Sequence, residues 1–121
     1  MALESLEEIA AFIVADGKGI LAADESNPTC GKRLEAIGVE STEDSRRGYR
    51  EMLFRAEGMK HNIGGVILFD ETIRQKAEDG TPLVDLIKTQ GALPGIKVDK
   101  GLRPLEDSPE ESVTQGLDGL N

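Results

Sequence analysis

The segment "GILAADES", residues 19–26, carries the pattern that decides the fold of this chain. It opens with a continuous apolar run and ends abruptly on two carboxylates and a hydroxyl. A short apolar run bounded by polar residues is typical of a strand buried on both faces. The segments "VILFDET" (residues 66–72) and "LPGIKVDKG" (residues 93–101) have the same form. We therefore expect three strands, each followed by polar side chains.

Helical patterns separate the expected strands. Apolar residues recur at helical spacing over residues 6–13, and further helices are expected over residues 28–37, after the candidate N-caps Ser41 and Thr42, and around residues 83–87. The inner face of the helix after Thr42 is expected to consist of Tyr49, Met52, Leu53 and Ala56. Residues 102–113 are expected to form a loop. Strands that alternate with helices predict an α/β fold with a parallel sheet.

Composition restricts the partners of the chain. Its 121 residues carry a formal net charge of −9, from 23 acidic and 14 basic residues, which argues against general nucleic-acid binding. A local basic pocket for a small phosphorylated ligand is compatible with that charge. Cys30 is the single cysteine, so no intrachain disulfide can form and a reducing compartment is expected. The N-terminal residues have no basic leader, and no apolar run approaches the roughly 20 residues that span a bilayer. We expect a cytoplasmic protein that makes no membrane contact.

The polar groups that follow the strands are expected to meet on one rim, because parallel strands point their carboxyl ends to the same side. Lys97 and Asp99 would share one face of the third strand, opposite Ile96 and Val98, which in a closed barrel would pack under helices. An inward ammonium must be paired, and Asp24 is a reasonable partner for Lys97.

Simpler interpretations remain open for these residues. Asp24 is equally compatible with a solvated strand end or a helix N-cap, and Lys97 with an edge-strand lysine. For Asp70 and Glu71 we prefer the N-capping interpretation. His61 stands alone in a polar turn, and Cys30 has the context of a structural residue. The sequence contains no metal-ligand cluster, dinucleotide-binding glycine motif or P-loop, so neither a metal nor a cofactor is expected.

Four segments together resemble the class I fructose-bisphosphate aldolase family in order and spacing. They are "GKGILAADES", "NIGGVILFDET", "GIKVDKG" and "TQGLDGL", and the segment "STEDSRRGYREMLF" resembles the family between its first two strands. The resemblance covers essentially the whole chain. It implies a (β/α)₈ barrel and the reversible cleavage of the sugar phosphate fructose 1,6-bisphosphate through a lysine Schiff base, without a metal.

The resemblance also implies roles for individual residues. Asp24 resembles a carboxylate that assists proton transfer, and Lys97 resembles a lysine that positions substrate and carboxylate. Arg33 resembles an arginine that binds a substrate phosphate, for which its planar guanidinium is suited. Glu25, Ser26, Thr29 and Asp99 fall at neighbouring substrate-binding positions. The family further implies a homotetramer.

Two departures from the family pattern matter. Asn27-Pro28-Thr29 stands where the family commonly has Thr-Gly-Ser, which reduces the backbone freedom of that loop. A complete barrel also needs roughly 250 residues, and the lysine nucleophile of the family matches no position here. We therefore expect residues 1–121 to form a single partial domain, the N-terminal part of a barrel with about three strands, which is inactive by itself. The alternatives are a non-catalytic fragment that acts as an oligomerising or interaction module, and an unrelated phosphate-binding half-barrel.

Overall fold

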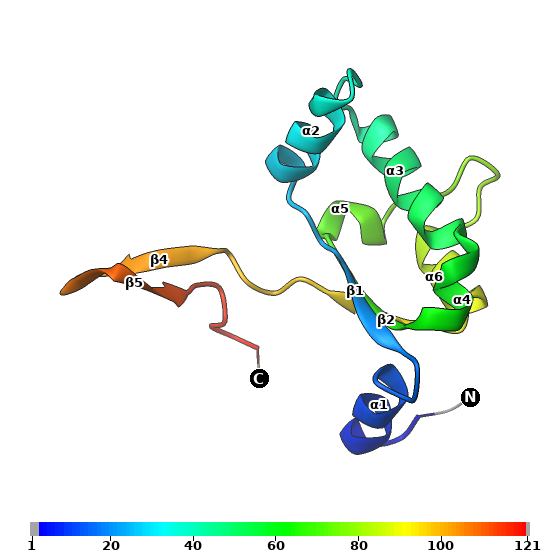
Figure 1. The fold of residues 1–121 in the computed structure, drawn as a ribbon, viewed down its shortest axis with the longest axis horizontal. Helices are drawn as coiled ribbons and strands as arrows, with labels where there is room; N and C mark the ends of the chain where they lie inside the picture. Colours follow the sequence, from blue (N-terminus) through cyan, green and yellow to red (C-terminus); the bar gives the residue numbers. More distant parts are fainter. Residues whose placement is uncertain (1–2, 121) are drawn as a thin grey trace.

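A parallel three-stranded sheet lies at the centre of the computed structural model, which describes residues 3–120 (Figure 1). The strands are β1 (Gly19–Ala23), β2 (Ile63–Leu68) and β3 (Leu93–Ile96), in the order β1-β2-β3. Leu21 lies opposite Val66, which lies opposite Pro94. The predicted α/β class and parallel sheet are confirmed.

Helices occupy the expected intervals between the strands. They are α1 (Leu6–Ile13), α2 (Asn27–Ala36), α3 (Glu43–Arg55), α4 (Glu57–Asn62), α5 (Asp70–Ile73) and α6 (Leu83–Thr89). Thr42 is the N-cap of α3, and the Thr42 and Ser45 side chains each accept a hydrogen bond from the other residue's backbone N–H. Glu43 and Asp44 lie in the first turn, where the helix dipole favours negative charge.

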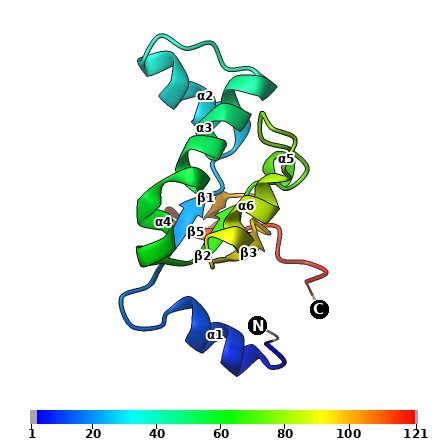
Figure 2. The same cartoon turned by 90° about the vertical axis from the view of Figure 1, so that its right-hand side faces the viewer.

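The hydrophobic core fills the space between one face of the sheet and helices α3, α4 and α6 (Figure 2). Its largest members are Phe54, Leu68, Leu83 and Ile87. The predicted inner face of α3 is only partly right: Leu53 packs against the core, but Met52 is 60% exposed while Arg50 and Phe54 are fully buried. The buried face of α3 runs through Arg50 and Phe54. A search for apolar residues at helical spacing cannot locate a buried face that contains an arginine.

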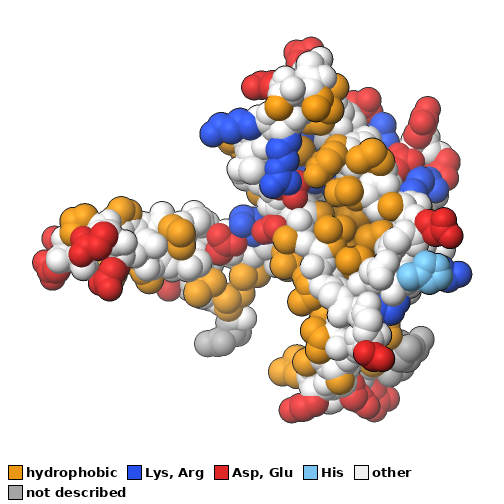
Figure 3. Space-filling model, viewed as in Figure 1, with side chains coloured by type: hydrophobic (Ala, Val, Ile, Leu, Met, Phe, Trp, Pro, Cys, Tyr) orange, Lys and Arg blue, Asp and Glu red, His pale blue; other side chains and the backbone are white. Residues whose placement is uncertain are grey.

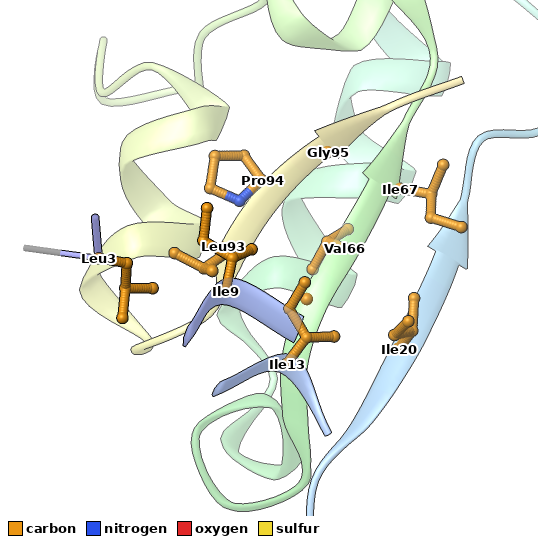
Figure 4. A pocket seen from close by; sticks show the side chains of 10 residues that line it. Leu3, Ile9, Ile13, Ile20, Val66, Ile67, Leu93, Pro94 and Gly95 are labelled. Carbon is orange, nitrogen blue, oxygen red and sulfur yellow. The ribbon is translucent and has the colours of Figure 1, made fainter. Parts of the chain in front are cut away.

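The opposite face of the sheet is covered by α1 only at one end. A Cβ atom at Gly64 would overlap the backbone carbonyl of Ile13, so this close approach of helix and strand requires glycine. Apolar side chains line an open cavity of about 560 Å³ beside α1 (Figure 4), among them Leu3, Ile9, Ile13, Ile20, Ile67 and Leu93. Apolar side chains are also visible on the molecular surface from the helices down to α1 (Figure 3).

An antiparallel hairpin replaces the loop expected over residues 102–113. Strands β4 (Leu102–Leu105) and β5 (Ser108–Thr114) pair with each other and extend away from the parallel sheet (Figure 1). Nearly every residue of both strands is exposed. Because neither face of the hairpin is buried, its strands need no alternation of apolar and polar residues. A sequence rich in proline and acidic residues therefore gives no sign of these strands.

The third strand is shorter than the expected segment 93–101. Its helix-side residue Ile96 is 43% exposed, as is Val98, and no helix follows β3 to cover them among residues 3–120. The backbone N–H of Lys97 still donates to the Leu68 carbonyl at 2.8 Å, so pairing continues one residue past Ile96. Over the same described residues, no helix is long and apolar enough to cross a membrane.

Candidate active site

The carboxyl ends of the three strands meet at an open pocket of about 660 Å³. Its lining contains every residue that the sequence assigned to a site: Asp24, Glu25, Ser26, Thr29, Arg33, Lys97 and Asp99. Phe69, Asp70 and Lys100 line it as well. The parallel arrangement of the strands thus brings together residues that lie up to 75 positions apart in the chain.

Lys97 pairs with two carboxylates in this pocket. Its Nζ lies 3.1 Å from Asp24 Oδ2 and 2.8 Å from Asp99 Oδ1. Hydrogen bonds to Asp99 and then to Asp24 raise the pKa of Lys97 above its usual value. Lys97 is therefore held as an ammonium between the two carboxylates, which suits an electrostatic role in the pocket.

Asp99 is held from two sides. The Lys97 ammonium, followed by the backbone N–H of Gly101, lowers the pKa of the Asp99 carboxyl. Gly101 donates to Asp99 Oδ2 at 2.9 Å. Asp99 is thus ionised and anchored to its own loop, and it fixes the ammonium beside Asp24.

Ser26, Thr29 and Arg33 are placed by the start of α2. Ser26 is the N-cap residue, and its hydroxyl donates to Thr29 Oγ1 at 3.2 Å. Arg33 follows Thr29 by four positions, which places both on one side of the helix. Pro28 lies in the first helical turn, where proline is well tolerated, so this departure from the family pattern leaves the helix start intact. Two hydroxyls, a guanidinium and a helix N-terminus are groups that bind phosphate.

The sequence did not identify Arg50, whose guanidinium is completely buried behind this turn. Its Nη2 donates to the backbone carbonyl of Glu25 at 2.6 Å and lies 3.9 Å from Glu25 Oε2. On the other side of that carboxylate, Arg33 Nη1 approaches Oε2 to 3.5 Å. The predicted inner face of α3 did not include Arg50, and nothing local to it in the sequence marks it as buried.

The capping interpretation of Asp70 and Glu71 is wrong. No side chain caps α5, whose N-cap residue is Phe69. Asp70 forms an exposed ion pair with Arg74. Glu71 accepts two hydrogen bonds from Arg46, at 2.8 and 2.9 Å, which tie α5 to α3. Such a bidentate pair satisfies both charges at once, and it outcompetes a backbone cap.

The Arg46–Glu71 pair predicts a pH-dependent contribution to stability. The Arg46 hydrogen bonds lower the pKa of the Glu71 carboxyl, so the folded state favours the ionised form. This stabilisation is present above the unfolded-state pKa of about 4.3 and is lost as the pH falls through the folded-state value. Glu71→Gln should lower the free energy of unfolding by about 1–3 kcal/mol at pH 7, and by much less near pH 3.

Urea unfolding at both pH values measures this difference. Glu78→Gln, an exposed carboxylate in the loop before α6, is the matched control. An equal loss of stability for Glu71→Gln at pH 7 and pH 3 would contradict the assignment.

The remaining candidate residues lie outside this cluster. His61 is exposed on α4, and Cys30 is buried in α2, where burial raises the pKa of its thiol. Within residues 3–120, no group of three or more His, Cys, Asp or Glu side chains could hold a metal ion.

Comparisons with known proteins point to the same family that the four sequence segments resemble. The family model for glycolytic class-I fructose-bisphosphate aldolase matches residues 5–121. A fructose-bisphosphate aldolase of Drosophila melanogaster is 60% identical over 118 residues, which cover 97% of this chain and 33% of the relative. Fructose-bisphosphate aldolase C of Carassius auratus is 59% identical, over 96% of this chain and 32% of the relative.

A solved structure agrees as well. Fructose-bisphosphate aldolase from Plasmodium falciparum, crystallised with TRAP and a small-molecule inhibitor, superposes with a TM-score of 0.86 at 50% identity. The match covers 93% of this chain and 32% of that one. The chain spans about a third of the length of the relatives it matches.

Proposed function

The chain belongs to the class-I fructose-bisphosphate aldolase family, and we propose that it supplies the first three strands and part of the active site of a barrel that cleaves fructose 1,6-bisphosphate. The products are dihydroxyacetone phosphate and glyceraldehyde 3-phosphate. We further propose that the barrel is cytoplasmic and assembles as a homotetramer, as the family resemblance implies.

The contact of Lys97 with Asp24 and Asp99 is the observation that carries this proposal. Retro-aldol cleavage needs a lysine amine that condenses with the ketone, releasing water and forming an iminium ion. The carbon–carbon bond then breaks, its electron pair moves toward the iminium nitrogen, and a base removes the hydroxyl proton on the departing carbon. Asp24 is a carboxylate suited to such proton transfers, and the charged Lys97 fixes its position. The amine that condenses lies outside residues 1–121.

The phosphate ligands of the proposal lie at the start of α2. Arg33 is 59% exposed at the pocket and can reach an anion without leaving a buried site. The hydroxyls of Ser26 and Thr29 lie in the same pocket, beside free N–H groups of the helix N-terminus. These groups bind one substrate phosphate in the proposal. Glu25 orients Arg33, and Asp99 holds Lys97.

A second candidate function rests on the uncovered face of the sheet. The apolar cavity beside α1 and the unpaired outer edges of β1 and β3, within the described residues, are features that favour association. As a partial domain, residues 1–121 could act as an oligomerising or interaction module without catalysis.

A cleavage assay separates the two functions. Fructose 1,6-bisphosphate cleavage is measured for residues 1–121 alone and for the full-length protein that contains them, with the mass of each species in solution. The aldolase proposal expects turnover only from the full-length protein. Absence of turnover in that protein, together with stable oligomers of residues 1–121, would favour the interaction module.

A further inference from the structure

We propose that Arg50 is a positioning residue that acts through Glu25 to keep Arg33 available for a substrate phosphate. The inference rests on the proposed function and assigns a role to a residue that makes no contact with the open pocket. It follows from three observations on the Arg50–Glu25–Arg33 cluster.

The first observation is that Arg50 is poorly satisfied for a buried charge. Its side chain is 0% exposed, and its Nε and Nη1 atoms have no hydrogen-bond partner among residues 3–120. Its one hydrogen bond, from Nη2, goes to the Glu25 carbonyl. Burying a charge in this way is costly, and an apolar side chain of similar volume is often at least as stable. Core packing therefore gives little reason for an arginine here.

The second observation concerns the carboxylate that Arg50 faces. The Glu25 side chain is only 7% exposed, and within the described part of the chain its Oε2 atom accepts no hydrogen bond. It lies between two cations, with Arg50 at 3.9 Å and Arg33 at 3.5 Å. A carboxylate this deeply buried needs positive charge nearby, and here two guanidinium groups share that task.

The third observation is that the two arginines differ in how deeply they are buried. Arg50 is fixed in the core behind the Glu25 backbone, whereas Arg33 is largely exposed at the pocket. Because Arg50 supplies compensating charge from behind, Glu25 holds Arg33 only loosely, beyond hydrogen-bond length. Without Arg50, Glu25 would have Arg33 as its remaining neutralising partner. The resulting tighter pair would have to break before Arg33 could bind phosphate.

The test measures phosphate binding in the full-length protein, with inorganic phosphate as a competitive inhibitor and with the KM for fructose 1,6-bisphosphate. Arg50→Met should raise the inhibition constant and KM about two- to fivefold, the range for strengthening one part-exposed ion pair that competes with the ligand. Adding Glu25→Gln to Arg50→Met should lower both constants below those of Arg50→Met, because the competing charge is gone. Arg47→Met, one turn earlier on α3 and paired with Asp44 and Glu51, is the matched control.

If Arg50 has only a structural role, the double variant should give a different result in the phosphate-binding test. If Arg50 acted only by stabilising α3 or the strand end, the double variant would bind phosphate as weakly as Arg50→Met or more weakly. Should Arg50→Met fail to fold, Arg50→Lys carries the same comparison, since an ammonium cannot reach the carbonyl and the carboxylate as a planar guanidinium does. The lysine variant should show a smaller rise that Glu25→Gln again reverses.

The outcomes also separate this inference from the proposed function. Wild-type turnover with unchanged constants in Arg50→Met would overturn the inference alone. A wild-type protein without turnover or phosphate inhibition would overturn the proposed function and the inference with it.

Discussion

Asp24→Asn in the full-length protein should lower kcat for fructose 1,6-bisphosphate by about 10²–10⁴-fold, the usual contribution of a positioned acid–base group. Asparagine keeps the shape of the side chain and can still accept a hydrogen bond from Lys97, but it cannot take up a proton. The fold should be preserved, because Lys97 keeps its 2.8 Å contact with Asp99. Steady-state cleavage assays and circular dichroism measure the two effects.

Asp70→Asn is the matched control for Asp24→Asn. Asp70 also lines the pocket, but its carboxylate is exposed and pairs with Arg74 on α5. Its substitution should leave kcat nearly unchanged. Wild-type turnover in folded Asp24→Asn would remove Asp24 from the mechanism.

Lys97→Met should lower kcat/KM by about 10²–10³-fold, the effect of removing one preorganised electrostatic group from an active site. The ammonium neutralises two carboxylates at once, and its loss leaves Asp24 and Asp99 facing each other without a cation. Both carboxylates lie within 3.1 Å of the Lys97 ammonium, and like charges that share a site repel each other, so Asp24 should lose its defined position. We expect kcat to fall and KM to rise, since the pocket also loses a positive charge.

The assignment of Lys97 has two controls. Lys88→Met removes an exposed lysine from α6 and should have no effect on either constant. Lys97→Arg keeps the charge with a different shape and should recover part of the activity. Equal activity of Lys97→Met and wild type would contradict the electrostatic role.

The site was more predictable from the sequence than its supporting residues were. Polar residues directly after an apolar run indicate the carboxyl-end rim of a parallel sheet. The alternation of side chains along a strand places Lys97 and Asp99 on one face. Their convergence with Asp24 followed from topology. Arg50 and the Arg46–Glu71 pair could not be found in this way, because their partners lie 25 positions away and on other elements.

In the fold, too, some elements could be predicted from the sequence and others could not. Strands β1 and β2 are continuous apolar runs, so the sequence located them. The expected burial of both faces is wrong for β1, where Ile20 is 54% exposed. The hairpin of β4 and β5 buries neither face, and its backbone pairing leaves no apolar signature. The buried face of α3 was predicted incorrectly because the burial of Arg50 depends on its hydrogen bond to the Glu25 carbonyl. The apolar periodicity of the helix contains no information about that partner.

The most direct test of the central claim is borohydride reduction of the full-length protein in the presence of dihydroxyacetone phosphate, followed by intact mass and peptide mapping. The account predicts a single stable adduct on a lysine outside residues 1–121, because Lys97 is engaged in ion pairs with Asp24 and Asp99. An adduct on Lys97, or on any other lysine within residues 1–121, would contradict the account.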